Sequence, residues 1–170
     1  KNVCELVRDA GDPPGKLAAA TRLAEIGQRQ IPNVQNPTLE AMAVLGQRPV
    51  VDFLLGLAEN AQVGDAQRTA ALEALAGKVG PADVDRLLAI GANERAPVDA
   101  RWEALGLLGD RRDASILPRL WPLLATPEKR VRLQVGQLIL NLGGPGAVSD
   151  FLHRLPATGR TEYHEDEVNQ

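Results

Sequence analysis

The fold is decided by three related stretches in the second half of the chain: RTAALEAL at residues 68–75, RWEALGLL at 101–108 and RLQVGQL at 132–138. Each begins with arginine and continues with small apolar residues and leucine. The arginines are 33 and 31 residues apart. Self-similarity at a fixed period of roughly 20 to 50 residues indicates a repeat architecture in which neighbouring units stack. The sequence therefore predicts a chain of repeated helical units.

The segments between these stretches repeat as well. An apolar stretch opens at spacings of 33, 32 and 32 residues, at Val51, Val84, Ile116 and Val148. Further apolar residues follow three or four positions later, which is the spacing of one helix face. Each repeat is thus predicted to contain two helices, which bury their apolar faces only by stacking on their neighbours.

The composition is that of a globular protein with few aromatic residues. Of the 170 residues, 44% are hydrophobic and only 3% are aromatic, so Leu, Ala, Val and Ile have to build the interior. The net charge of −3 and the pI of about 5.4 argue against a protein that holds nucleic acid by neutralising phosphates. Because no run approaches the roughly 18 apolar residues of a transmembrane helix, we expect a soluble protein. The single cysteine, Cys4, excludes an internal disulfide framework and leaves the cytoplasm and the periplasm both open.

The apolar spacing predicts helices throughout and no strand. Residues 1–48 are expected to form irregular helical repeats, and residues 49–155 the regular ones. The expected helices are 2–10, 16–28, 37–46, 49–59, 65–78, 81–90, 97–108, 113–124, 128–142 and 145–155. The last of these has no second helix and is expected to close the stack with a polar outer face made of Ser149, Asp150, His153 and Arg154.

Residues 156–170 form an acidic polar tail without an apolar helix face. A segment of this composition does not become ordered through its own propensity. We expect its carboxylates to be held by the basic pairs Arg111-Arg112 and Lys129-Arg130 or by a basic groove of a partner.

One unit of the chain resembles a HEAT repeat: residues 116–135, ILPRLWPLLATPEKRVRLQV, followed by Leu142-Gly143. The shared features are an apolar first helix bent by an internal proline, a short turn containing proline, and a second helix opened by Val-Arg and ended by Leu-Gly. The units around Arg68 and Arg101 are similar but lack the internal proline. The resemblance covers residues 49–155 and implies a short α-solenoid of about four to five helix pairs whose second helices line the concave side. HEAT-like proteins are mainly scaffolds and adaptors, with a few enzymes among them.

Stacking of the repeats would place Arg68, Arg101 and Arg132 in a row. The row could bind a ligand, or its arginines could be structural and pair with groups of the repeats themselves. We expect the structural role, because buried charges are normally paired. The resemblance implies that each arginine pairs with an acidic residue of its own or the next repeat. The nearby candidates are Asp65, Asp99 and Glu128.

The sequence contains no recognisable catalytic, cofactor or metal centre. The two histidines, His153 and His164, are 11 residues apart, and one distant cysteine does not complete a set of metal ligands. No nucleophile has an identifiable partner base, and no glycine-rich loop follows a strand. We therefore predict no catalytic residue, no cofactor and no metal.

The predicted function is that of a non-enzymatic scaffold or adaptor that binds a protein partner or assembly component along its second helices. Trp102 takes the position of Thr69 in the preceding unit, so we expect it to be half-exposed, whereas Trp121 is expected in the core. The alternative is a HEAT-like enzyme such as a bilin lyase or a DNA glycosylase, which the acidic pI and the few aromatics disfavour. The expected partner contacts are the polar positions that face away from the apolar stripes: Gln67, Glu73, Trp102, Glu103, Lys129, Gln134, Gln137 and Asn141.

Overall fold

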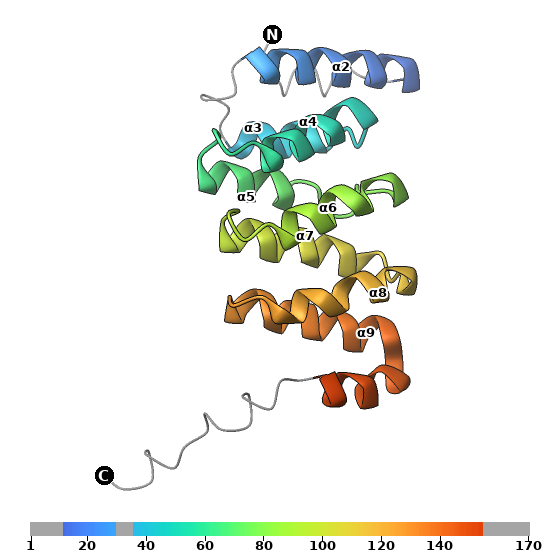
Figure 1. Cartoon of the computed structure of the whole chain (residues 1–170). Helices are drawn as coiled ribbons and strands as arrows, with labels where there is room; N and C mark the ends of the chain where they lie inside the picture. Colours follow the sequence, from blue (N-terminus) through green and yellow to red (C-terminus); the bar gives the residue numbers. More distant parts are fainter. Residues whose placement is uncertain (1–11, 30–35, 155–170) are drawn as a thin grey trace, which may run out of the picture.

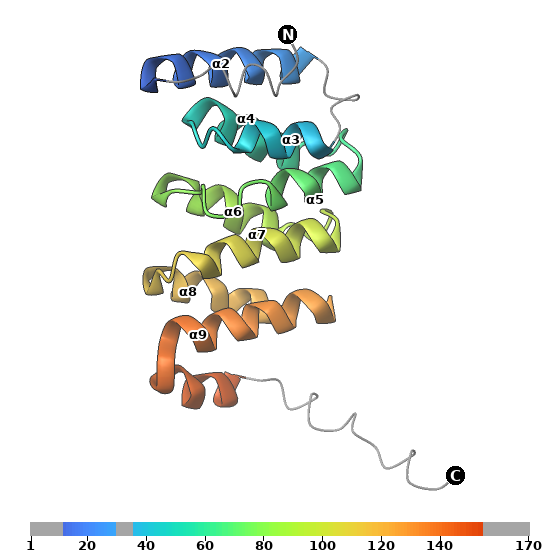
Figure 2. The same cartoon turned by 180° about the vertical axis from the view of Figure 1, so that it is seen from behind.

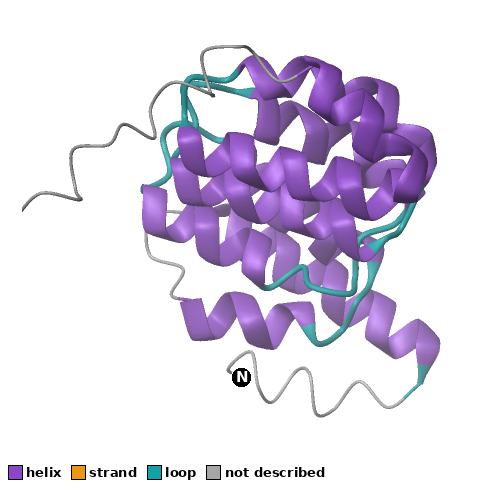
Figure 3. Cartoon of the chain, turned by 90° about the horizontal axis from the view of Figure 1, so that it is seen from below, coloured by secondary structure: helices purple, strands orange, loops and turns teal. Residues whose placement is uncertain are grey.

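Every regular element in the described part of the chain is a helix, as the apolar spacing predicts (Figure 3). The computed structural model describes residues 12–29 and 36–154. The expected helix at 2–10, Cys4, His164 and the acidic tail lie outside these residues. Among the described helices, none is both long enough and apolar enough to cross a membrane.

The elements follow in a simple order along the chain. The α-helices are α2 (Pro13–Arg29), α3 (Asn36–Ala43), α4 (Arg48–Glu59), α5 (Asp65–Glu73), α6 (Val84–Ala92), α7 (Val98–Asp110), α8 (Leu117–Leu120) and α9 (Lys129–Arg154). Three short 3-10 helices flank them: η2 (Pro81–Asp83), η3 (Ala114–Ile116) and η4 (Trp121–Ala125).

The helices succeed one another along one axis of the molecule in sequence order (Figures 1 and 2). α4 packs against α5, α6 against α7, and α8 with η4 against α9, so neighbouring helices contact one another in pairs. The first helices of successive pairs, α2, α4 and α6, contact one another in turn, and so do the second helices α5, α7 and α9. At the N-terminal end of the described stack, α2 contacts α4, and α3 contacts both α4 and α5.

Burial follows the repeat seen in the sequence. Leu75, Leu108 and Ile139 occupy equivalent positions in successive units, and all three are fully buried. Burial of apolar surface of this kind is the main favourable contribution to folding. A second equivalent set, Ala71, Ala104 and Val135, is also fully buried, and the residues that open the first helices, Val51, Val84 and Ile116, are buried as well.

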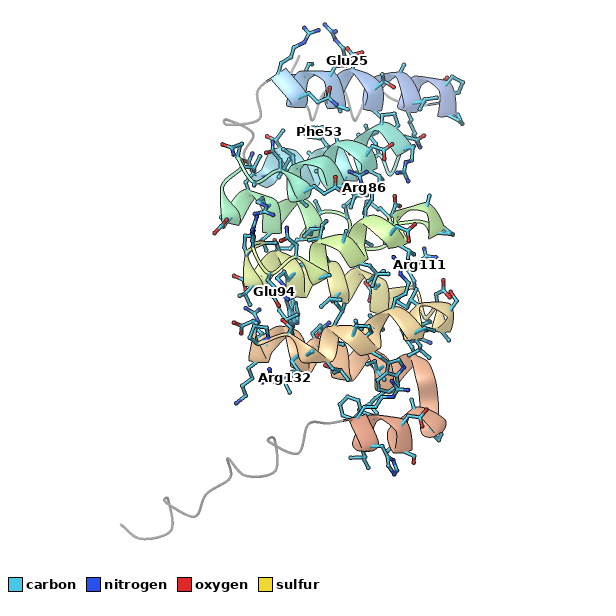
Figure 4. The ribbon with its side chains drawn as sticks, viewed as in Figure 1. Glu25, Phe53, Arg86, Glu94, Arg111 and Arg132 are labelled. Carbon is cyan, nitrogen blue, oxygen red and sulfur yellow. The ribbon has the colours of Figure 1, made fainter. Side chains whose placement is uncertain are left out.

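A glycine lets α2 approach the rest of the stack. A Cβ added to Gly27 would lie 2.4 Å from the ring of Phe53 on α4. Phe53 is buried between these two helices, where Figure 4 labels it. The absence of a side chain at position 27 therefore lets the largest apolar group of α4 pack directly against the α2 backbone.

The helix expected at 81–90 is divided into η2 and α6, the helix expected at 37–46 ends at Ala43, and two further expected helices differ more strongly from the observed ones. The helix expected at 113–124 is divided into η3, α8 and η4, because Pro118 and Pro122 lack the N–H that a continuous helix needs. The helix expected at 65–78 ends at Glu73, and the following residues form turns, with the N–H of Leu75 donating to the carbonyl of Leu72. Trp121, expected in the core, is only partly buried.

The boundary expected between residues 142 and 145 is a sharp bend within α9. Gly144 has φ 59° and ψ −157°, a backbone conformation that glycine adopts without steric cost, and Pro145 follows it. After the bend, Phe151 approaches Trp121, with the ring centroids 6.5 Å apart.

The end of the stack is less polar than expected. The side chains of Val148 and Leu152 are 45% and 63% exposed, although Val51 and Leu55, their counterparts in an earlier repeat, are buried. The residues after the bend therefore repeat the apolar pattern of a first helix, and two of its apolar positions face solvent. The four polar residues expected on the outer face, Ser149, Asp150, His153 and Arg154, are all exposed, and these two apolar side chains are exposed beside them.

Candidate functional site

Two arginines of the predicted row cross-link the helices of a pair. Arg68 and Arg101 are each 4% exposed. Their Nε atoms donate to the carbonyl oxygens of Ala58 and Gly91, each at 3.0 Å, near the C-terminal ends of α4 and α6. The last carbonyls of a helix lack intrahelical partners and carry partial negative charge, so a buried guanidinium is well placed there.

The predicted carboxylate partners of the row were wrong. In the described ranges, none of the three arginines forms an ion pair. Arg101 donates a further hydrogen bond to the buried hydroxyl of Thr126 at 2.8 Å, and Arg132 donates to the carbonyl oxygens of Thr126 and Pro127. Asp99 pairs instead with Arg130. The sequence distance to an acidic residue misled the prediction, because the helix-end carbonyls lie closer in space.

We call the exposed side of α4, α6 and α8 the first-helix face. Its charged side chains form a network across repeats, and Arg86, labelled in Figure 4, donates to both Glu59 and Asp52. Arg48 pairs with Asp52 and with Asp83, whose side chain is 1% exposed and also accepts the N–H of Gly80 at 2.7 Å.

The network extends to α8 through an ion pair between Arg119 and Asp85. Hydrogen bonds to Asp52 and then Asp83 raise the pKa of the Arg48 guanidinium above its ordinary value. The hydrogen bond to Glu59 raises the pKa of Arg86 in the same way. The charges of this face are therefore largely occupied by one another.

The second-helix face, which we define as the exposed side of α5, α7 and α9, is different. A hollow of about 710 Å³ lies along α7 and α9. Most of its lining is polar, and two leucine side chains contribute to it. The lining residues are Trp102, Gly106, Gly109, Asp110, Arg112, Gln134, Gln137, Leu138, Asn141 and Leu142.

Two glycines of α7 shape this hollow in different ways. A Cβ at Gly109 would lie 2.7 Å from Cδ2 of Leu138, so this glycine permits the close approach of α7 and α9. A Cβ at Gly106 would meet only Nε2 of Gln134, at 3.8 Å, which is ordinary contact. Helix packing therefore does not require glycine at position 106, and its missing side chain leaves the floor of the hollow open.

Trp102 borders the hollow and is held by a cation. The guanidinium carbon of Arg130 lies 5.2 Å from the centroid of the Trp102 ring, within the range of a cation–π interaction. Arg130 is fixed in turn by its ion pair with Asp99. As expected, Trp102 is half-buried, so part of its ring is accessible.

Glu103 lies beside Trp102 on α7 and has few favourable partners. Partial burial raises the pKa of its carboxyl, and the negative charges of Glu73 and Asp99 raise it further, while Arg130 lowers it. This carboxylate is therefore less stable in its ionised form than an exposed glutamate is.

The structure brings four of the eight predicted contact residues together, and Trp102, Gln134, Gln137 and Asn141 line the same hollow. The other four do not line it. Glu73 and Glu103 lie on α5 and α7 and interact electrostatically, Gln67 lies on α5, and Lys129 begins α9. Sequence reasoning missed Gly106, although a signal existed, since Glu73 and Gln137 occupy the equivalent positions in the neighbouring units.

The basic pairs are also partly engaged. Arg111 is half-buried, and its Nη1 donates to the carbonyl oxygen of Val79 at 3.3 Å. Arg112 adopts a positive φ of 52° and lines the hollow. Arg130 is paired to Asp99, whereas Arg111, Arg112 and Lys129 form no ion pair among the described residues.

A second hollow, of about 520 Å³, lies where η4 meets the end of α9. Its lining is mainly apolar, and the guanidinium of Arg154 lies 4.8 Å from the centroid of the Trp121 ring. Within residues 12–29 and 36–154, no group of three or more His, Cys, Asp or Glu side chains is arranged to hold a metal ion. Nδ1 of His153 lies 2.7 Å from the carbonyl oxygen of Ser149.

No protein-family model matches the sequence, and no curated protein matches it.

Proposed function

We propose that this chain is a short α-solenoid of HEAT-like helix pairs that serves as a non-enzymatic protein-interaction module. The partner binds to the second-helix face, centred on the hollow between α7 and α9. The sequential stacking of paired helices, the repeat of their buried positions and the HEAT-like unit at 116–135 support the architecture.

One observation carries the assignment of the face: the hollow that gathers Trp102, Gln134, Gln137 and Asn141 around the open position at Gly106. A partly accessible tryptophan beside a hollow is typical of interface centres, where Trp is enriched among the residues that contribute most to binding. The first-helix face offers less to a partner, because its carboxylates and guanidinium groups are already paired with one another.

A photo-crosslinking amino acid at two positions tests the assignment. Gln137 lies in the hollow, and Ala89 is exposed on α6 on the opposite face. In extract of the source cells, we expect a discrete protein adduct from position 137 and not from position 89. The adduct should fall at least about tenfold when Gly106→Leu fills the hollow, as loss of an interface centre does.

The matched control is Gly56→Leu. Gly56 lies on α4, one turn from Asp52, and an added Cβ there meets nothing within 4 Å. This variant makes the same chemical change in a helix of the first-helix face and should leave the adduct unchanged. Equal adducts from positions 89 and 137, or an adduct insensitive to Gly106→Leu, would contradict the proposed face.

A further inference from the structure

We infer that the hollow between α7 and α9 takes an extended peptide segment of a protein partner and recognises it mainly through its main chain. The inference rests on the proposed function and deepens it, because it states the form in which the partner enters the site. It is carried by the side-chain amides that line the hollow, by its length and by the open backbone at Gly106.

The amides form a row along one side of the hollow. Gln134, Gln137 and Asn141 lie three and four residues apart on α9, the spacing that places side chains on one helix face. In the described part of the chain, none of these three side chains makes a hydrogen bond to another protein group. Each amide offers an acceptor oxygen and two N–H donors, so the row matches the alternating C=O and N–H groups of a peptide main chain.

The length of the row fits a short extended segment. A helix rises about 1.5 Å per residue, so Gln134 and Asn141 are separated by about 10 Å along α9. An extended chain advances about 3.3 Å per residue, so the row spans about three to four residues of a partner. The floor at Gly106 lets a main chain approach closely, since a side chain at that position would occupy the space.

A partner helix fits the same hollow less well. The main-chain groups of a helix are bonded internally, so they would leave the amides of α9 without partners, and displacing water from unpaired polar groups costs free energy. A helix-binding groove presents apolar pockets at helical spacing. Here the large apolar side chains of the lining are Trp102, Leu138 and Leu142, among a mainly polar surface.

The charged side chains at the edge of the hollow favour neither a positively nor a negatively charged partner. Asp110 and Arg112 both line it, two residues apart in sequence. Recognition is therefore expected to depend on the main chain and on one side chain packed against the accessible part of the Trp102 ring.

The test uses the whole chain and short random peptides displayed on phage. Peptides are selected for binding to the unaltered chain and against binding to the Gly106→Leu variant. One selected peptide is then synthesised with a fluorescent label, and its dissociation constant is measured by anisotropy. We expect Gly106→Leu to weaken binding at least about tenfold and Gly56→Leu to change it less than about twofold.

An N-methyl scan of the selected peptide distinguishes main-chain from side-chain recognition. Each N-methyl group removes one main-chain donor, and we expect losses of about tenfold at alternate positions of a short stretch. The double substitution Gln137→Ala with Asn141→Ala changes two exposed residues, so folding is retained, and it should remove the dependence on N-methylation.

Two results would overturn the inference. If Gly106→Leu abolishes binding while no N-methyl group has an effect, the hollow binds a partner through side chains, and the proposed function survives without the extended main chain. If no peptide prefers the unaltered chain to Gly106→Leu, the hollow is not a peptide site. The photo-crosslink from position 137 then decides separately whether the face binds a protein at all.

Discussion

The two faces of this molecule are built from the same repeats but use their polar side chains differently. On the first-helix face, Arg86 pairs across repeats with Asp52 and Glu59, Arg48 pairs with Asp83, and Arg119 pairs with Asp85. On the second-helix face, the amides around the hollow have no protein partner among the described residues, and Glu103 is held in an unfavourable electrostatic environment. The difference is the basis of the proposal that a partner binds the second-helix face, because the charges of the first-helix face are already paired with one another.

The largest expected effect is a loss of stability on replacing Arg101, which is buried between the two faces. Arg101→Ala would leave the Gly91 carbonyl and the Thr126 hydroxyl without their donor and open a cavity. We expect a loss of about 3 kcal/mol in the free energy of unfolding. Arg132→Ala is the control, because Arg132 is partly exposed and its loss is expected to cost less than about 1 kcal/mol. Urea denaturation measures both, and equal losses would show that Arg101 has no special structural role.

The second prediction compares the change in stability when one carboxylate on each face is neutralised. Asp83→Asn weakens a buried group that accepts from Arg48 and from the Gly80 N–H, so we expect a loss of about 2 kcal/mol. Glu103→Gln on the second-helix face removes a charge that its neighbours disfavour, so stability should be unchanged or increased. If both variants lose stability in urea denaturation, the contrast between the faces is wrong.

A smaller effect separates the two glycines of α7. Gly106→Ala should stabilise the protein by about 0.5–1 kcal/mol, because alanine is the better helix former and its Cβ has room. Gly109→Ala should destabilise by about 1 kcal/mol, because its Cβ would force Leu138 to move. Thermal unfolding of the two variants side by side checks the opposite signs. Destabilisation by Gly106→Ala would mean that glycine is needed there for packing and not for an open floor.

The smallest effect is the pH dependence contributed by Glu103. Its pKa in the folded protein is raised, so the folded state binds more protons than the unfolded state between the ordinary glutamate pKa and the raised value. In that window this group makes the protein less stable as pH rises, and the contribution is fully present below the ordinary pKa. The difference in unfolding free energy between the parent chain and Glu103→Gln, followed across that window, should therefore change with pH. A constant difference would show that Glu103 titrates normally.

Sequence reasoning recovered the all-helical class and many of the buried positions, because the repeat places apolar residues at the same helical positions in each unit. The equivalence of Leu75, Leu108 and Ile139 could be read from spacing alone, and all three are buried. The prediction was weaker where the chain breaks a helix. Pro118 and Pro122 divide a segment expected to be one helix. Each proline lacks the N–H that donates an intrahelical hydrogen bond, and its ring clashes with the preceding turn of a helix.

Only part of the candidate site could be predicted from the sequence. Trp102, Gln134, Gln137 and Asn141 were identified as polar or half-exposed positions on second helices, and they line the same hollow. Gly106 was missed, because a glycine inside a helix gives no indication of whether its missing side chain serves packing or leaves space. Only the surrounding atoms distinguish Gly106 from Gly109.

The sequence by itself determined the all-helical class and most of the buried positions of the repeats, because these depend on the periodicity of apolar residues along the chain. The tertiary structure alone decided which polar groups meet. Arg68 and Arg101 bond to carbonyl oxygens at the ends of the preceding helices, although acidic residues lie nearer in sequence, and Asp99 pairs with Arg130. The physical reason is that hydrogen bonds and ion pairs depend on distances of a few ångströms between atoms of different helices, and a one-dimensional pattern does not contain those distances.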